Sequence, residues 1–272
     1  MLLNRLIAVS ILLVLRVDLS ADSYDHEMMP ADASLPTLWL IGDSTVKVST
    51  ENQWGWGEKL PDYIDASKYN VVNRAIGGRS SRTFITQGWW TKILELMKPG
   101  DYVIMQFGHN DSSSINDASR ARGTIKGIGE ETEAIDNLLT GKPETVHTYG
   151  WYIRKYISDT RSKSATPIIC SPVPRKIWEN GKIERDMRGY PAAAKEVARN
   201  QKTSFIDLSE IIARRYESLE PEIVDTFFAD ERVHQSAAGA IFNAEAVIAG
   251  IKGFAQNPLE KSLGKRSKQV AA

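Results

Sequence analysis

Short apolar runs alternate along this chain with segments of helical periodicity, and this alternation constrains the fold more than any other feature. Near-continuous apolar runs are typical of strands in a parallel sheet that is buried on both faces. The order of runs and helical segments predicts successive βαβ units, and therefore an α/β domain on an open, doubly wound parallel sheet. The apolar runs occupy residues 37–44, 70–76, 101–108, 166–173 and 204–208, and the helical segments residues 56–66, 81–98, 147–162, 191–201 and 237–254.

Length and charge limit the number of domains and the kinds of partner. One large α/β domain is the simplest organisation for 272 residues, and we assign it to residues 35–257. Within it, residues 112–146 form a long polar stretch whose length is typical of a functional loop. Residues 258–272 form a charged tail that we expect to be frayed. Lys plus Arg and Asp plus Glu number 34 each, so the chain lacks the positive field of a nucleic-acid binder.

The N-terminal segment, residues 1–21, has the anatomy of a secretory signal peptide, because Arg5 precedes an apolar run from Leu6 to Leu15. A spanning helix needs about 20 apolar residues, so we expect no stable membrane insertion. The mature chain should then be secreted or periplasmic; a buried N-terminal helix is the alternative. Cys170 is the only cysteine, so no internal disulfide can form.

Polar groups suited to catalysis follow the predicted strands. In open α/β sheets, ligands bind beyond the carboxyl ends of the strands. Ser44 follows the first apolar run, and Asn110 follows the third. Gly78 follows the second, where a glycine lets the main chain approach a ligand and donate its N–H. A late loop carries His234 beside two acidic residues, so these places supply a hydroxyl, hydrogen-bond donors, a base and an acid.

Sequence blocks at these places resemble the GDSL/SGNH hydrolase superfamily, over about residues 38–251. More narrowly, they look like those of rhamnogalacturonan acetylesterases. The resemblance implies a three-layer α/β/α sandwich around a five-stranded parallel sheet, flavodoxin-like in outline. It also implies hydrolysis of O-acetyl esters on a plant cell-wall polysaccharide. The narrower likeness is carried by Gly42-Asp-Ser-Thr45, Gly78-Arg-Ser-Ser-Arg82, Gln106-Phe-Gly-His-Asn-Asp111 and Val146-His-Thr-Tyr-Gly-Trp-Tyr152. The likeness to the superfamily is carried by the residues after the first three apolar runs and by the loop with His234.

The resemblance implies a role for each matching residue. Ser44 would be the nucleophile and His234 its general base, and a serine hydroxyl needs such a base because it is a weak nucleophile alone. The backbone N–H groups of Ser44 and Gly78 and the side-chain amide of Asn110 would hold the oxyanion. No metal or organic cofactor is implied. The chain has no G-x-S-x-G elbow, which counts against the ordinary α/β-hydrolase fold.

The acid that orients the histidine is where this sequence departs from the family. The family pattern is Asp-x-x-His, whereas Glu231 stands three residues before His234 and Asp230 stands four before it. Glu also serves in some Ser-His-Glu arrangements, so by register we favour Glu231. Asp230 is the alternative, and a histidine oriented by neither acid is the third possibility.

Two other functions remain compatible with these residues. One is a general short-chain esterase or lysophospholipase; the other is a carbohydrate-binding protein that keeps the fold without catalysis. The expected partner is an acetylated polysaccharide or oligosaccharide, bound by a monomer. One or two of the five tryptophans most suited to stacking on sugar rings could contact it, while the others belong to the core. These five are Trp54, Trp56, Trp89, Trp90 and Trp178.

Overall fold

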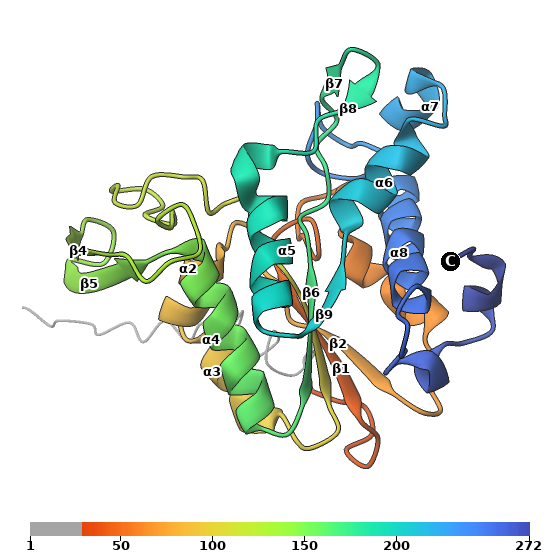
Figure 1. The fold of residues 1–272 in the computed structure, drawn as a ribbon, viewed down its shortest axis with the longest axis horizontal. Coiled ribbons are helices and arrows are strands. Elements are labelled where there is room, and N and C mark those ends of the chain that lie inside the picture. The colour runs from red at the N-terminus through yellow and green to blue at the C-terminus, as the bar shows by residue number, and fades with distance from the viewer. Residues whose placement is uncertain (1–28) are drawn as a thin grey trace, which may run out of the picture.

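A five-stranded parallel sheet lies at the centre of the computed structural model, which describes residues 29–272 (Figure 1). The predicted signal peptide lies outside the described residues. The strand order is β2-β1-β3-β6-β9, so the direction of winding reverses at β1, where open α/β sheets leave a crevice for ligands. All five predicted strands are confirmed: β1 (Thr37–Gly42), β2 (Asn70–Asn73), β3 (Tyr102–Gln106), β6 (Thr166–Cys170) and β9 (Ser204–Ile206).

Both faces of the sheet are covered, which confirms the three-layer sandwich. Along β1, Leu38 and Leu40 point into one core while Trp39 and Ile41 point into the other, as the two-residue repeat of a strand requires. Figure 1 shows the helices in two sets, one on each face of the sheet. The first set is α2 (Ser81–Thr86), α3 (Trp89–Leu96), α4 (Tyr149–Ser162) and α5 (Tyr190–Asn200); the second is α6 (Leu208–Tyr216) and α8 (Ala237–Lys252).

The helices differ from expectation in three parts of the chain. Residues 56–66 form two 3-10 turns, η1 (Trp56–Glu58) and η2 (Leu60–Tyr63), because Pro61 interrupts the segment. Residues 81–98 form two helices, since Gly88 adopts a φ of +82° between α2 and α3. Neither α6 nor the short helix α7 (Pro221–Asp225) was expected from the sequence.

The long polar stretch at residues 112–146 is ordered by the core. It ends in an antiparallel hairpin of β4 (Thr132–Asn137) and β5 (Lys142–His147), which projects away from the sheet (Figure 1). Arg82 on α2 is fully buried and binds both carboxylate oxygens of Glu144, at 2.7 and 2.8 Å. Its guanidinium also donates to the carbonyl oxygens of Ile115 and Gly123. One buried cation therefore fixes the base of the hairpin and the arm before it.

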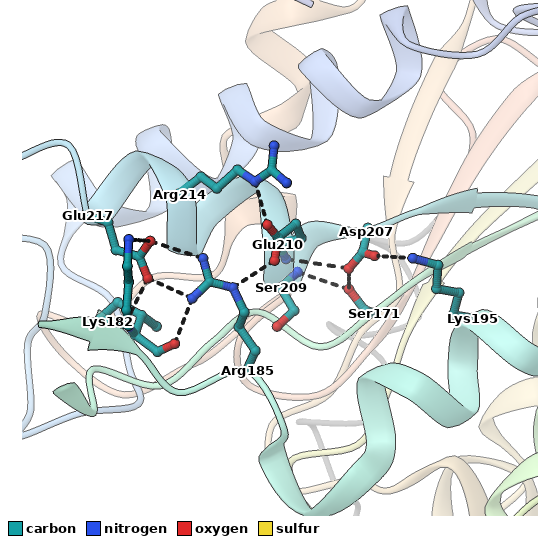
Figure 2. A network of polar contacts seen from close by, with 10 residues as sticks. Ser171, Lys182, Arg185, Lys195, Asp207, Ser209, Glu210, Arg214 and Glu217 are labelled. Carbon is teal, nitrogen blue, oxygen red and sulfur yellow. Dashed lines mark hydrogen bonds and ion pairs between the residues drawn. The ribbon is translucent and has the colours of Figure 1, made fainter. Parts of the chain in front are cut away.

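A second hairpin, β7 (Trp178–Glu179) with β8 (Lys182–Ile183), is fixed to α6 by ion pairs and precedes the 3-10 turn η3 (Met187–Gly189). Figure 2 shows Arg185 reaching the carboxylates of Glu210 and Glu217, at 2.7 and 2.6 Å. Lys182 contacts Glu217 as well, at 3.3 Å. Hydrogen bonding to Arg185 lowers the pKa of Glu217 to about 2, so this pairing persists at any ordinary pH.

The C-terminal segment packs onto the α8 side of the sheet, so the expectation of a frayed tail is wrong. Leu259 is fully buried and Val270 nearly so. The ammonium of Lys252 donates to the carbonyl oxygens of Ser267 and Val270, at 2.7 and 2.5 Å. Apolar residues between the charges anchor two 3-10 turns there, η4 (Glu260–Ser262) and η5 (Arg266–Gln269). Within residues 29–272, no helix combines the length and apolar character needed to cross a bilayer.

Candidate active site

The loops after β1, β2, β3 and β6 meet the loop before α8 around an open cavity of about 710 Å³. Its wall includes Ser44, Gly78, Asn110 and His234, so the fold brings together four of the residues singled out from the sequence. They lie at the carboxyl edge of the sheet, beside the point where the strand order reverses.

The turn that carries Ser44 is fixed by a chain of buried hydrogen bonds. Asp43 accepts hydrogen bonds from the backbone N–H and the hydroxyl of Thr45, at 2.9 and 2.8 Å. Gln106 at the end of β3 donates to the Thr45 hydroxyl, and the indole of Trp56 donates to Gln106 at 2.8 Å. All four of these side chains are fully buried. The polar groups behind the turn therefore hold its backbone, while the Ser44 hydroxyl lines the cavity.

His234 links the serine to a carboxylate. Its Nε2 lies 3.0 Å from Ser44 Oγ, and its Nδ1 lies 2.5 Å from Asp230 Oδ2. Burial acts to raise the pKa of Asp230, but hydrogen bonds from the Val233 amide and from His234 outweigh it, and the net pKa is lowered. An ionised Asp230 favours the tautomer with the proton on Nδ1, which leaves the Nε2 lone pair facing the serine hydroxyl.

The preference for Glu231 is therefore corrected, because the carboxylate that contacts the ring belongs to Asp230. Asp230 Oδ1 accepts three backbone N–H bonds, from Arg232, Val233 and His234, at 3.0, 2.7 and 3.0 Å. Asp commonly nucleates a tight turn by binding the amides that follow it. This turn brings His234, four residues after Asp230, back over the Asp230 side chain. Glu231, in contrast, is exposed.

Candidate oxyanion donors line the same cavity. Gly78 has a φ of +76°, and the guanidinium of Arg122 donates to its carbonyl oxygen at 3.0 Å. The Asn110 side chain is buried and donates one amide hydrogen to the Arg79 carbonyl at 2.8 Å. Its second amide hydrogen is left to donate to a ligand in the cavity. Within residues 29–272 the backbone N–H groups of Ser44 and Gly78 make no hydrogen bond. Their role as donors to an oxyanion stays a prediction.

Sequence reasoning missed the cationic side chains of the cavity wall. Arg120, Arg122 and Arg175 line the wall together with Arg79, and no Asp or Glu does. Arg175 follows β6, so the rule that located Ser44 and Asn110 also points to it. Arg120 and Arg122 lie in the long polar stretch, whose length indicated a functional loop but did not single out these two side chains. None of the seven tryptophans, all within the described residues, lines the cavity, and Trp56 and Trp90 are buried in the core.

Residues suited to metal binding do not gather at this site. Over residues 29–272, no group of three His, Cys, Asp or Glu side chains is placed to hold a metal ion. Cys170 is buried in β6, where burial raises the pKa of its thiol and keeps it protonated.

Comparison with known proteins identifies the family. The family model described as the GDSL-like lipase/acylhydrolase family matches residues 40–240. A probable rhamnogalacturonan acetylesterase of Bacillus subtilis is 33% identical over 233 residues, covering 83% of this chain and 96% of the relative. A rhamnogalacturonan acetylesterase of Emericella nidulans is 30% identical over 215 residues, covering 79% of this chain and 84% of the relative.

A solved structure agrees with the family model. The crystal structure of protein YxiM from Bacillus subtilis superposes with a TM-score of 0.65 at 28% sequence identity, covering 80% of this chain and 56% of that one. The match of the family model spans the loops that carry Ser44 and His234. The chain therefore belongs to the GDSL-like lipase/acylhydrolase family and is a carboxylic ester hydrolase.

Proposed function

We propose that this protein is a serine esterase that removes O-acetyl groups from a plant cell-wall polysaccharide of the rhamnogalacturonan or pectin type. The observation that carries the proposal is the array of Ser44, His234 and Asp230, joined at 3.0 and 2.5 Å on the wall of one cavity. The relatives named rhamnogalacturonan acetylesterase support the choice of polymer and acyl group.

The chemistry follows from the positions of these atoms. Ser44 Oγ attacks the acetyl carbonyl carbon as its proton passes to His234 Nε2, and Asp230 stabilises the imidazolium that forms. The carbonyl oxygen becomes an oxyanion held by the N–H groups of Ser44 and Gly78 and by the Asn110 amide. His234 then returns the proton to the departing sugar oxygen, which leaves an acetyl-serine and a free sugar hydroxyl. Water, deprotonated by His234, releases acetate and restores Ser44.

The cavity wall favours a polar substrate over a lipid. Only Val48, Leu139 and Val233 among the wall residues have large apolar side chains, whereas four arginines line it. A long acyl chain would leave these guanidinium groups without water or anionic partners, at considerable cost in free energy. This observation argues against a lysophospholipase. The main argument for a carbohydrate binder without catalysis was that Glu231 stands where the family has Asp. That argument is weakened, because Asp230 supplies the carboxylate beside His234.

Replacement of the nucleophile tests the proposal. Ser44→Ala should lower the turnover of p-nitrophenyl acetate and the release of acetate from acetylated pectin by about 10⁶-fold, the loss found for the serine of a comparable triad. Ser162→Ala, an exposed serine at the end of α4, is the matched control and should retain parental rates. Turnover by Ser44→Ala within tenfold of the parent would show that another group attacks the ester.

Location and assembly are part of the same proposal. The signal-peptide pattern of residues 1–21 supports secretion or a periplasmic location for a monomeric enzyme. Mass spectrometry of the exported chain should find that about 20 N-terminal residues have been removed. An exported chain that still begins at Met1 would contradict this part.

A further inference from the structure

Arg175 occupies a specific place in the cavity. It lies directly after β6 and the Pro-Val-Pro sequence of residues 172–174, and it lines the same wall as Ser44 and His234. The side chain is about half buried, and its Nε atom is fully enclosed. The side chain therefore borders the same space that a substrate enters when its ester reaches Ser44.

The guanidinium of Arg175 has no partner of its own. Within residues 29–272 its side chain makes no hydrogen bond or ion pair, and its buried Nε is unsatisfied. Burial, Arg188 and Arg232 lower its pKa, while Glu184 and Asp43 act weakly in the opposite direction without forming an ion pair with it. A partly buried cation among other cations is unfavourable in free energy, and an anionic ligand would relieve this.

The charge of the wall as a whole points to the same ligand. Arg79, Arg120 and Arg122 line the cavity with Arg175, and no carboxylate side chain lines it. Arg122 has a structural task, since it donates to the Gly78 carbonyl and to the Ser113 hydroxyl. Arg175 has no such task. A planar guanidinium with several donors matches the two oxygens of a carboxylate.

The backbone holds Arg175 in place before any ligand arrives. The next residue, Lys176, donates its backbone N–H to the carbonyl of Arg232 at 2.9 Å, and the N–H of Ile177 donates to the Arg175 carbonyl at 2.8 Å. The hairpin that follows is fixed to α6 by the ion pairs of Arg185 (Figure 2). The backbone at Arg175 is therefore ordered before binding, and a ligand has only the side chain left to immobilise.

We infer that Arg175 binds a carboxylate of the substrate, so that the enzyme selects acetylated saccharides that carry a uronate close to the acetyl ester. Arg175 is then a specificity determinant that does not take part in bond breaking. This inference rests on the proposed function, because it assumes that a saccharide ester occupies the cavity. A preference for a nearby uronate would distinguish acidic polymers such as pectin from neutral acetylated polymers such as xylan.

A matched pair of substrates tests the inference. Acetylated oligogalacturonides are compared with the same oligosaccharides after methyl esterification, which removes the negative charges and keeps the acetyl groups. Acetate release gives kcat/KM for each, and the parent enzyme should prefer the acidic form by at least about tenfold, as expected for one charge-assisted hydrogen-bonded pair. Equal kcat/KM for the two forms would overturn the inference even if p-nitrophenyl acetate hydrolysis shows that the esterase works.

Variants assign the preference to one side chain. Arg175→Gln should reduce the acidic-to-neutral ratio about tenfold, and Arg175→Lys should reduce it less, since the charge remains while the planar donor geometry is lost. Arg199→Gln removes an exposed arginine on α5 and should leave the ratio as in the parent. An unchanged ratio in Arg175→Gln, or equal slowing on both substrates, would assign Arg175 a structural role. If Arg175→Gln does not fold, the acidic-to-neutral ratios of kcat/KM for the parent and for Arg175→Lys still test the inference, because the ratio should be lower in Arg175→Lys.

Discussion

The backbones that carry Ser44 and His234 are held in different ways, although their side chains meet at 3.0 Å. The Ser44 turn lies against fully buried Asp43, Thr45 and Gln106, contributed by two strand ends of the sheet. The loop of His234 is closed by bonds within five residues, and the side chains of His234 and Asp230 are 27% and 33% exposed. One position thus depends on buried side chains at the edge of the sheet, and the other mainly on a local turn, which the Lys176 amide joins to the loop after β6.

This difference separates stability from catalysis. Changes behind Ser44 disturb buried groups that have no access to water, so they should lower the free energy of unfolding. Changes in the loop of residues 230–234 leave their groups near solvent, so they should alter turnover while the fold persists.

Among the changes that probe this difference, the largest effect should follow from the loop. Asp230→Asn keeps the oxygen that accepts the three backbone bonds but removes the charge beside His234, and turnover should fall by about 10⁴-fold, as for the equivalent change in a well-studied protease. Glu231→Gln, one residue away and exposed, is the control and should keep parental turnover. Initial rates on p-nitrophenyl acetate measure turnover, and thermal unfolding measures the stability of the fold. Severe loss in Glu231→Gln with a normal Asp230→Asn would refute the turn described here.

A buried group should make stability depend on pH. Asp111 is fully buried, accepts hydrogen bonds from the backbone N–H and hydroxyl of Ser81, and burial raises its pKa from 3.8 to about 7. Between these values the folded state holds a proton that the unfolded state has released. The free energy of unfolding should therefore fall as the pH rises through this window, by up to about 4 kcal/mol.

Asp111→Asn should remove this decline. Urea unfolding of parent and variant at intervals from pH 4 to pH 8 measures the difference, which should grow with pH in favour of the variant. Parallel curves would show that Asp111 titrates alike in the folded and unfolded states.

The Asn110 amide should contribute to turnover more than to stability. Asn110→Ala removes a proposed oxyanion donor, so kcat should fall by about 10²–10³-fold with a smaller change in KM. Asn116→Ala removes an amide that donates to Asp136 in the hairpin arm, and it serves as the control. Michaelis kinetics on p-nitrophenyl acetate give both constants. A rise in KM with unchanged kcat would assign Asn110 to substrate binding instead.

The smallest effect should come from the groups behind the nucleophile. Thr45→Val keeps the shape of the side chain but removes the hydroxyl between Asp43 and Gln106, so the free energy of unfolding should fall by about 1–3 kcal/mol. Thr226→Val loses an exposed hydroxyl and is the control. Urea unfolding compares the two. Equal stability of both variants would mean that the buried network does not hold the turn.

The sequence predicted the parts of this molecule that follow from periodicity and strand order. Five apolar runs became five parallel strands, and the rule that ligands gather at their carboxyl ends placed Ser44, Gly78 and Asn110 on one cavity wall. Arg175 obeys the same rule and could have been found by applying it to the fourth strand of the chain as well.

Other features depend on side-chain contacts that no periodicity encodes. A three-residue register favoured Glu231, but the three amides that bind Asp230 decide which acid faces the ring. The C-terminal segment was expected to fray because of its charges, yet Leu259 and Val270 anchor it. Residues 112–146 are held in part by a buried arginine that lies well before them in the sequence, Arg82.

The hydrogen bond from the Lys176 amide to the Arg232 carbonyl joins the loop of Arg175 to the loop of His234. Inserting or deleting residues after β6 would shift that carbonyl, and the imidazole with it. Exchange of whole loops between relatives is therefore a poor route to new substrate preference in this scaffold. Replacing single side chains on an unaltered backbone is the route open both to protein engineers and to natural divergence.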